Sequence, residues 1–583
     1  MFKKYLFLSL LFLIIPFSLS LAEEEPEGYV ARISLINGDV SIKRGDDKDW
    51  IAASINMPLQ TGDYIYSPKV AKAEVQFDNG AHIRLSENTD LGILNLSGDI
   101  IQLKIGAGRA TLGIRELSKS GAFEVDTANV AITPLASGRY RIDVDEDGNT
   151  VLTIQKGKAE VTTDGGSITI SDGQRISIEG IDSQEYEIAQ ADKRDAWDEW
   201  NDERDGRLAT VKSKEYVPVY ISGVEDLDAH GRWAVVPEYG YVWTPTVVEV
   251  GWAPYRAGRW VWRDPWGWVW VSYEPWGWAP YHYGRWVFVT SIGWCWMPEE
   301  RRAAVWRWRP GLVRFAMGPS WVAWVPLGPR EVYYWRHTPS VSVGVSVNVN
   351  ITNSVTIVHR DTFLRGVKVS APLPPNPFKT GKIIAGPPLI VPTKASLAPL
   401  PTKVVPRYAV PSAKVIHRPA VVKTTPPPAP KTFYEKKKEI KASGGLPVKE
   451  LTHSPKTGEV KKEAIKGKQA MPAREIKSGK GTFKPKETKP SPIERERRNE
   501  SKKEIAPKDP DRKKVMPEKR PEGKKETRPE KRPEKRKEEK PPVLKKEGVK
   551  KQKAIKENKE DKSIKGQRED KEMGPRKGRK KDN

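Results

Sequence analysis

Short runs of alternating hydrophobic and polar residues fill the first third of the chain. Between positions 29 and 180 they include 40–43, 73–77 and 151–154, and Asn-Gly or Asp-Gly pairs stand between such runs. Glycine supplies the positive φ of a tight hairpin turn, and Asn or Asp is tolerated just before it. This spacing of strands and turns predicts an antiparallel all-β domain over residues 29–180.

A second pattern, built on tryptophan, occupies residues 216–337. Eighteen of the 21 tryptophans lie between Trp233 and Trp335, and the triplet Gly-Arg-Trp recurs three times, ending at Trp233, Trp260 and Trp286. Repeats of this length are typical of arrays of one supersecondary unit. Each unit reads as a strand, a Gly-containing turn and a strand, which predicts a Trp-rich domain of β-hairpins.

Within the second unit, the two-residue period of a strand places Trp260 and Trp262 on one face, and it does the same for Trp268 and Trp270. Pairing of the two strands sets these rings opposite one another, and cross-strand aromatic pairs stabilise a sheet by about 0.2–1 kcal/mol each. The guanidinium groups of Arg259 and Arg285 are candidates to lie on these rings.

Other segments complete the organisation. Residues 181–215 are predicted to form a helical linker, with Trp197 and Trp200 on one helical face. Residues 338–430 are predicted to hold a β-ribbon, from the alternation at 341–351, and then a Pro-rich spacer. Residues 431–583 are dense in Lys, Glu and Pro, which predicts a disordered basic tail. The predicted fold class is therefore mainly β.

The positive charge is concentrated at one end of the chain. Residues 431–583 hold 53 Lys and Arg against 28 Asp and Glu, so this segment alone carries the +25 of the whole chain. The charge therefore does not indicate a nucleic-acid-binding domain. A basic tail can hold an anionic surface of lipid headgroups or polysaccharide, or it can simply keep the chain soluble.

The N-terminus has the pattern of a secretory signal peptide. Two lysines precede an apolar run at 5–19, and small residues stand at Ser20 and Ala22. This predicts a signal peptide over residues 1–22, cleaved after Ala22, and a periplasmic or secreted protein of the cell envelope. An uncleaved membrane anchor is the alternative, although the run is short for a bilayer span and Pro16 interrupts it. Export also argues against nucleic acid as a partner.

Several motifs of the first domain resemble the FecR domain and cover most of residues 31–180. FecR proteins are transmembrane regulators with a cytoplasmic anti-sigma segment and a periplasmic sensing domain, whereas here the domain directly follows the predicted signal peptide. The resemblance implies a periplasmic β-domain that makes protein contacts. Its motifs are Gly-Asp-Val at 38–40, Trp50, Leu-Gln-Thr-Gly-Asp at 59–63, Glu-Val-Gln-Phe-Asp-Asn-Gly at 74–80, Ser-Gly-Arg-Tyr-Arg-Ile at 137–142, and the segments 155–157 and 172–174.

The Trp-rich region resembles an uncharacterised family of bacterial proteins with Tyr-x-Trp-Gly-x-Trp-type repeats, which often follow a FecR-like domain. The resemblance covers roughly residues 190–365. It implies a location in the cell envelope and carries no known activity. The matching stretches are 239–243, 252–256, 264–268, 281–286 and 324–331.

Two roles are open for the aromatic rings of this region. In one role, exposed rings stack on the sugars of a glycan or of peptidoglycan. In the other, the rings pack on one another as a core, since each tryptophan can bury up to about 250 Å². The candidate ligand-stacking residues are Trp260, Trp262, Trp268, Trp270, Trp276, Trp278, Tyr281 and Trp286.

The sequence offers no catalytic residues, no cofactor site and no metal site. Asp264 and Glu274 each precede Pro-Trp-Gly, so turn chemistry accounts for them better than a glycosidase pair does. The acidic run at 143–149 resembles the start of a calcium loop, but the twelfth position, where the loop needs a bidentate Glu, is Ile154. We therefore expect an acidic hairpin turn there. Cys295 has no His or acid placed to activate it.

These observations favour a non-enzymatic, exported envelope protein that binds or scaffolds through the β-domain and the Trp array. Its expected partners are envelope polysaccharide or peptidoglycan, a periplasmic protein, and an anionic surface for the tail. The alternative is a FecR-like periplasmic regulatory or sensing partner in protein–protein signalling. No cofactor is expected.

Overall fold

The computed structural model describes residues 29–117, 122–218, 221–298, 307–339, 341–366, 378, 381–397, 408–448 and 479–482. The predicted signal peptide and most of the predicted basic tail lie outside these residues. The described chain is mainly β with antiparallel sheets and few short helices, which confirms the predicted fold class.

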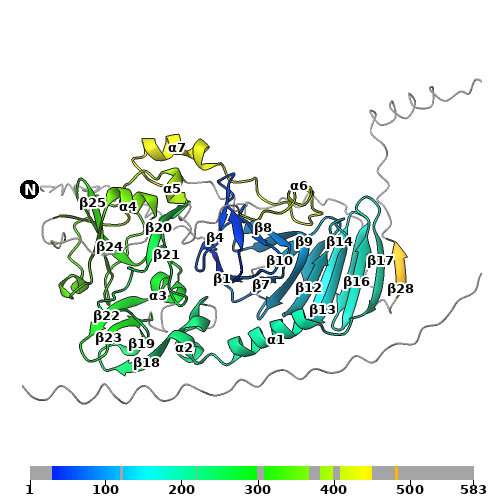
Figure 1. Cartoon of the computed structure of the whole chain (residues 1–583), viewed down its shortest axis with the longest axis horizontal. Coiled ribbons are helices and arrows are strands. Elements are labelled where there is room, and N and C mark those ends of the chain that lie inside the picture. The colour runs from blue at the N-terminus through cyan, green and yellow to red at the C-terminus, as the bar shows by residue number, and fades with distance from the viewer. Residues whose placement is uncertain are drawn as a thin grey trace, which may run out of the picture. The chain divides into compact units, whose positions relative to one another are not determined.

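The first domain is a β-sandwich of two sheets (Figure 1, blue to cyan). Sheet A contains β1 (Ala31–Asn37), β4 (Pro58–Leu59), β6 (Lys72–Phe77), β7 (His82–Leu85), β12 (Gly138–Val144), β13 (Thr150–Lys156), β16 (Gln174–Glu179) and β17 (Glu185–Gln190). Sheet B contains β2 (Ser41–Lys43), β3 (Trp50–Ala52), β5 (Tyr64–Ser67), β8 (Thr89–Leu96), β10 (Ala122–Asp126), β11 (Ala131–Pro134), β14 (Lys158–Thr163) and β15 (Gly166–Ser171).

One long strand, β9 (Ile100–Ile114), belongs to both sheets. Its first half pairs with β8 and, in parallel, with β10, whereas its second half pairs with β7 and β12. The strand passes from sheet to sheet at Gly108, whose φ is +98°. A Cβ at this position would lie 2.5 Å from the Cα of Thr89, so both the backbone conformation and the close approach require glycine.

Alternation along the strands explains the core of the sandwich. On β9 and β12, residues such as Leu103, Leu112, Tyr140 and Ile142 point inward and are buried between the sheets. The residues between them point outward, and many of these are charged. The sandwich therefore has an apolar interior and two polar outer faces.

The Trp-rich domain consists of two four-stranded sheets and one hairpin. The first sheet has the order β18 (Gly231–Val236), β19 (Gly240–Pro245), β23 (Gly293–Met297) and β22 (Arg285–Val289), and the second has the order β26 (Thr356–His359), β25 (Trp321–Pro326), β24 (Val313–Met317) and β27 (Lys382–Ile384). The hairpin pairs β20 (Gly258–Arg263) with β21 (Gly267–Ser272).

The predicted strand–turn–strand units and their opposed rings are confirmed. Trp260 lies across from Trp270, and Trp262 lies across from Trp268, in the register of the β20–β21 hairpin. The prediction for Arg259 was wrong, because its guanidinium lies over the ring of Tyr273, 5.6 Å from the centroid.

Two segments differ from their sequence-based description. The range predicted as a helical linker begins with β17, which pairs with β16 along its whole length because Tyr186 and Ile188 alternate with polar residues; the helix α1 (Ala196–Ala209) starts only afterwards. Residues 341–346 form no strand, since they have no pairing partner among the described residues, and a 3₁₀ turn, η3 (Val347–Asn350), follows.

The remaining helices are short. They are η1 (Lys212–Glu215), η2 (Val224–Asp226), α2 (Leu227–His230), α3 (Trp278–His282), α4 (Arg360–Arg365), α5 (Lys394–Leu397), α6 (Ala413–Ile416) and α7 (Phe433–Ala442). The last of these lies inside the range predicted as a tail. A four-residue strand, β28 (Gly479–Thr482), pairs with the edge of β17. Among the described residues, no helix has the length and apolar character that a membrane span needs.

Candidate functional site

The eight candidate ligand-stacking rings lie in the interior of the Trp-rich domain. None of Trp260, Trp262, Trp268, Trp270, Trp276, Trp278, Tyr281 and Trp286 exposes more than 4% of its surface, and all belong to one hydrophobic cluster. A sugar ring needs a free aromatic face to stack on, and these rings offer none in the described conformation. Their glycan role stays a prediction that their positions do not support.

Edge-to-face contacts organise this cluster. The rings of Trp262 and Trp268 meet at 83° with centroids 5.4 Å apart, and the ring of Trp260 lies edge-on to Trp324 of β25 at 5.9 Å. Such pairs add about 0.5–1.5 kcal/mol beyond the apolar area that they bury. The array therefore joins the hairpin to the sheet of β24–β27 and acts as a core.

Glu274, one of the two carboxylates considered for catalysis, is a buried hydrogen-bond acceptor. Its side chain accepts from Trp252 Nε1 at 2.6 Å, from the Tyr281 hydroxyl, and from Ser272 Oγ at 3.3 Å. Burial raises the pKa of Glu274 to about 7. Every partner is a structural residue of the core, which agrees with the turn interpretation of this position.

Buried polar contacts join the two domains. Arg263 of β20 places Nη2 3.1 Å from Asp63 Oδ2 and donates to the Pro58 carbonyl at 2.7 Å. Arg32 of β1 forms an ion pair of 2.7 Å with Asp226. Because both partners of the Arg263–Asp63 pair are buried, removal of either one would leave an uncompensated charge.

The outer face of sheet A carries a row of arginines. They come from four strands of the run β7–β9–β12–β13–β16, and their chain neighbours, such as Ile83, Ala110 and Ile176, point into the sandwich core. The row consists of Arg84 of β7, Arg109 of β9, Arg139 and Arg141 of β12, and Arg175 of β16.

Helix α1 binds this row with four aspartates. Asp195 and Asp198 each lie 2.9 Å from Arg141, and Asp205 lies 2.6 Å from Arg84. The fourth, Asp202, pairs with Arg139. The spacing of three or four residues brings these carboxylates to one face of the helix.

Two further contacts position α1. Asp195 caps the helix by accepting the amides of Trp197 and Asp198, and the Asp195 amide donates to the Asp198 carboxylate. Trp197 Nε1 donates to Thr111 Oγ1 on β9 at 2.8 Å. Ion pairs and the packing of side chains such as Trp197 therefore hold this helix on the sheet.

The ion pairs determine the charge states of carboxylates on both the helix and the sheet. Burial raises the pKa of Asp205, but the charge of Arg84 outweighs this effect and holds it below its ordinary value. Burial likewise opposes ionisation of Glu74 on β6, yet hydrogen bonds from Arg204 lower its pKa well below the usual range. Both carboxylates are therefore charged at neutral pH, and so is the face that they contact.

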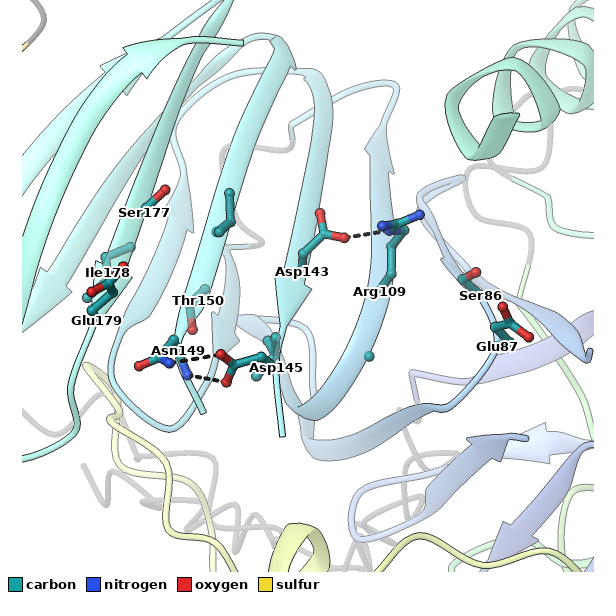
Figure 2. Close-up of a pocket in the computed structure, with 13 residues that line it drawn as sticks. Ser86, Glu87, Arg109, Asp143, Asp145, Asn149, Thr150, Ser177, Ile178 and Glu179 are labelled. Carbon is teal, nitrogen blue, oxygen red and sulfur yellow. Dashed lines mark hydrogen bonds and ion pairs between the residues drawn. The ribbon is translucent and has the colours of Figure 1, made fainter. Parts of the chain in front are cut away.

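Beyond α1 the face is hollowed. One cavity of about 470 Å³ is lined by residues that include Arg109, Asp143, Asn149, Ser177 and Glu179, and Figure 2 shows Arg109 pointing at Asp143 across neighbouring strands. A second cavity of about 510 Å³ shares Arg109 and Asp143 and reaches Arg175. Both hollows are lined by a mixture of charged, polar and apolar side chains.

The acidic run at the end of β12 forms a hairpin turn, as predicted. Asp145 Oδ1 accepts the amides of Asp147, Gly148 and Asn149 at 2.9, 2.7 and 2.9 Å. The side chain of Asn149 donates back to Asp145 at 2.8 Å (Figure 2). The carboxylate is thus committed to closing the β12–β13 turn at one rim of the first cavity.

Comparison with known proteins assigns both domains. Residues 63–160 match the FecR protein family, and residues 224–331 match a family of unknown function, DUF6600. The chain carries a FecR domain and a DUF6600 domain. This confirms the resemblance seen in the sequence. No curated protein matches the chain.

Two crystal structures of a proposed anti-sigma factor from Parabacteroides distasonis are similar to part of the chain. The identities are 14% and 15%, the TM-score is 0.20 for both, and each match covers 22% of this chain and 60% of the solved one. The chain thus spans about 60% of the structures that it matches. We draw no functional conclusion from this likeness.

Sequence reasoning predicted a helix here but missed the arginine row and the ion pairs that hold the helix on it. The ion pairs join residues as far apart as Arg84 and Asp205, so no local pattern reveals them. Two signals were nevertheless present: arginines at every second position of 139–141, and aspartates three or four residues apart at 195–205. Together they indicate a charged strand face and a complementary helix face.

Proposed function

We propose that this protein is a non-enzymatic, exported scaffold whose FecR domain contacts a protein of the cell envelope as a regulatory or sensing partner. FecR proteins combine a membrane anchor with a periplasmic domain, and the predicted signal peptide supports the same compartment here. The DUF6600 domain supplies a rigid core in this proposal, since its candidate rings are buried.

One observation carries the proposal. The outer face of sheet A binds an acidic helix of its own chain through ion pairs such as Arg141–Asp198 and Arg84–Asp205. Next to that helix, the same face has the hollows that Arg109 and Arg175 line. A face that holds one polar protein segment through side chains is suited to extending the contact to a second protein.

Site-specific photo-crosslinking of the full chain in its native cells tests this function. A photoreactive residue replaces Ser177, at the hollow of sheet A, or Asp164, exposed in the β14–β15 hairpin. We expect one discrete adduct of defined mass from position 177 in the periplasmic or membrane fraction, and none from position 164. An absence of adducts from both positions, or the same ladder from both, would contradict the proposed function.

A further inference from the structure

We propose that the outer face of sheet B is a groove for a basic peptide, and that residues 409–424 of this chain occupy it in cis until a partner's peptide displaces them. The inference rests on the proposed function and deepens it by naming the kind of partner. It concerns the face of the sandwich opposite to the arginine row.

The groove is polar in a place where the alternation of strands predicts solvent exposure. On β9, Leu103 points into the core, whereas Gln102 and Lys104 point outward. On β10, Glu124 and Asp126 also lie on the outer face, on either side of the core residue Val125. Yet none of these four polar residues exposes more than 7% of its surface. Another part of the chain covers them.

The covering segment is the one that the sequence describes as a Pro-rich spacer. It begins with the Ser41 hydroxyl donating to the Ala409 carbonyl at 2.5 Å, and α6 then places Val415 against Gly106 of β9. From Arg418 to Val422 it has no helix, strand or turn, and the chain bends at Lys423 and Thr424. We call residues 409–424 the strap.

Groove side chains bind the main chain of the strap. Glu124 Oε1 accepts the amides of Lys423 and Thr424 at 2.8 and 3.0 Å, and Gln102 Nε2 donates to the Thr424 carbonyl at 2.8 Å. Further along, Lys104 Nζ donates to the Arg418 carbonyl at 2.6 Å. Contacts of this kind recognise the main chain of a peptide and do not require one particular side-chain sequence.

Three basic side chains of the strap meet acidic or carbonyl groups of the sandwich. Lys414 lies 3.0 Å from Asp147, and Lys423 forms an ion pair with Glu160. Arg418 is buried and donates to the Gly106 carbonyl at 3.0 Å and to the Glu146 carbonyl. A competing peptide would therefore need basic residues at similar intervals.

The groove also contains polar atoms that the strap does not satisfy. Asp90 Oδ1, Gln102 Oε1 and Asp126 Oδ1 are buried and have no hydrogen-bond partner among the described residues. Burial raises the pKa of Asp90 to about 7. An unpaired buried acceptor is unfavourable, so a peptide that donates to these atoms would bind more tightly than the strap does.

A competition experiment on the full chain tests the groove. The probe is a fluorescein-labelled peptide of residues 409–424, followed by anisotropy at low salt. In the wild type the strap competes at an effective concentration on the order of millimolar, so we expect weak binding. Arg418→Ala with Lys423→Ala weakens the strap, and we expect the peptide to bind that variant at least tenfold more tightly. Lys437→Ala with Lys438→Ala, on the exposed face of α7, is the matched control and should bind as the wild type does.

Two further arms make the result specific. Glu124→Ala, added to the weakened-strap variant, should reduce peptide binding at least tenfold, and a scrambled peptide of the same composition should bind at least tenfold more weakly. In the wild type, excess unlabelled peptide should accelerate hydrogen exchange at the amides of Lys423 and Thr424, which requires no variant to fold.

The proposal is overturned if the weakened-strap variant binds no better than the wild type, if Glu124→Ala has no effect, if the scrambled peptide binds equally well, or if excess peptide leaves the two exchange rates unchanged. These outcomes are independent of the adduct expected at position 177, because that position lies on sheet A. Failure of the groove would leave the proposed function standing, and loss of the adduct would leave the groove standing.

Discussion

Glu274 gives the most quantitative prediction. Its carboxyl is buried, accepts hydrogen bonds from Trp252, Ser272 and Tyr281, and has its pKa raised by burial to about 7 from an ordinary 4.5. A carboxyl with a raised folded-state pKa contributes its full stability below pH 4.5, and that contribution is lost as the pH rises through 7. Each unit of difference between the folded and unfolded pKa corresponds to about 1.4 kcal/mol. The free energy of unfolding therefore falls by about 3 kcal/mol at pH 8.

Glu274→Gln removes this dependence while it preserves the shape of the side chain and an oxygen acceptor. Linkage predicts that the free energy of unfolding of the variant, relative to the wild type, increases by about 2–3 kcal/mol between pH 5 and pH 8. Other titrating groups cancel in this comparison because both proteins contain them. Urea unfolding followed by tryptophan fluorescence measures the difference, since most of the tryptophans belong to the same domain.

The matched control is Glu238→Gln, an exposed carboxyl in the β18–β19 turn, for which no pH-dependent difference from the wild type is expected. A difference between the Glu274→Gln variant and the wild type that is equal at pH 5 and pH 8 would refute the reasoning. It would mean that Glu274 is ionised in the folded protein at both values.

Three further substitutions test the packing and the ion pairs. Trp270→Ala should reduce the free energy of unfolding by about 3–5 kcal/mol in urea titrations, whereas Phe288→Ala, at a side chain that is 38% exposed, should cost about 1 kcal/mol or less; equal losses would argue against the Trp core. Glu74→Ala strips the carboxylate from Arg84 and Arg204 and should cost about 3–5 kcal/mol at pH 7, a loss that shrinks as the pH falls because the pKa of Glu74 is depressed. Gly108→Ala should lower the thermal midpoint by at least the equivalent of about 1 kcal/mol, and an unchanged midpoint would show that the crossing of β9 tolerates a side chain.

The alternation of residues predicted much of the fold. Periodicity at 260–270 placed Trp260 opposite Trp270, and the glycine turns located the hairpins, because both signals are local. Whether a Trp face meets solvent or core depends on which sheet packs against it. Trp324 and Phe315 provide that surface for Trp260, and they lie more than fifty residues away.

The strap was missed for a similar reason. Proline and lysine content indicated a spacer, but the groups that hold Lys423 belong to Glu124 and Glu160, more than 260 residues earlier. Helix α7 had a local signal that composition obscured. Thr432 and Glu435 form its capping box, a pattern readable in the sequence even within a basic, Pro-rich region.

The most direct test of the account combines crosslinking at position 177 with reversal of a charge in the arginine row. Arg175 lines the second hollow and forms an ion pair of 3.6 Å with Asp192, outside the bounds of α1. We predict that the adduct formed from position 177 in native cells falls at least fivefold on Arg175→Glu, while the amount of folded protein is unchanged. An adduct of undiminished yield would contradict the claim that the arginine-lined face of the FecR domain is where this protein meets its partner.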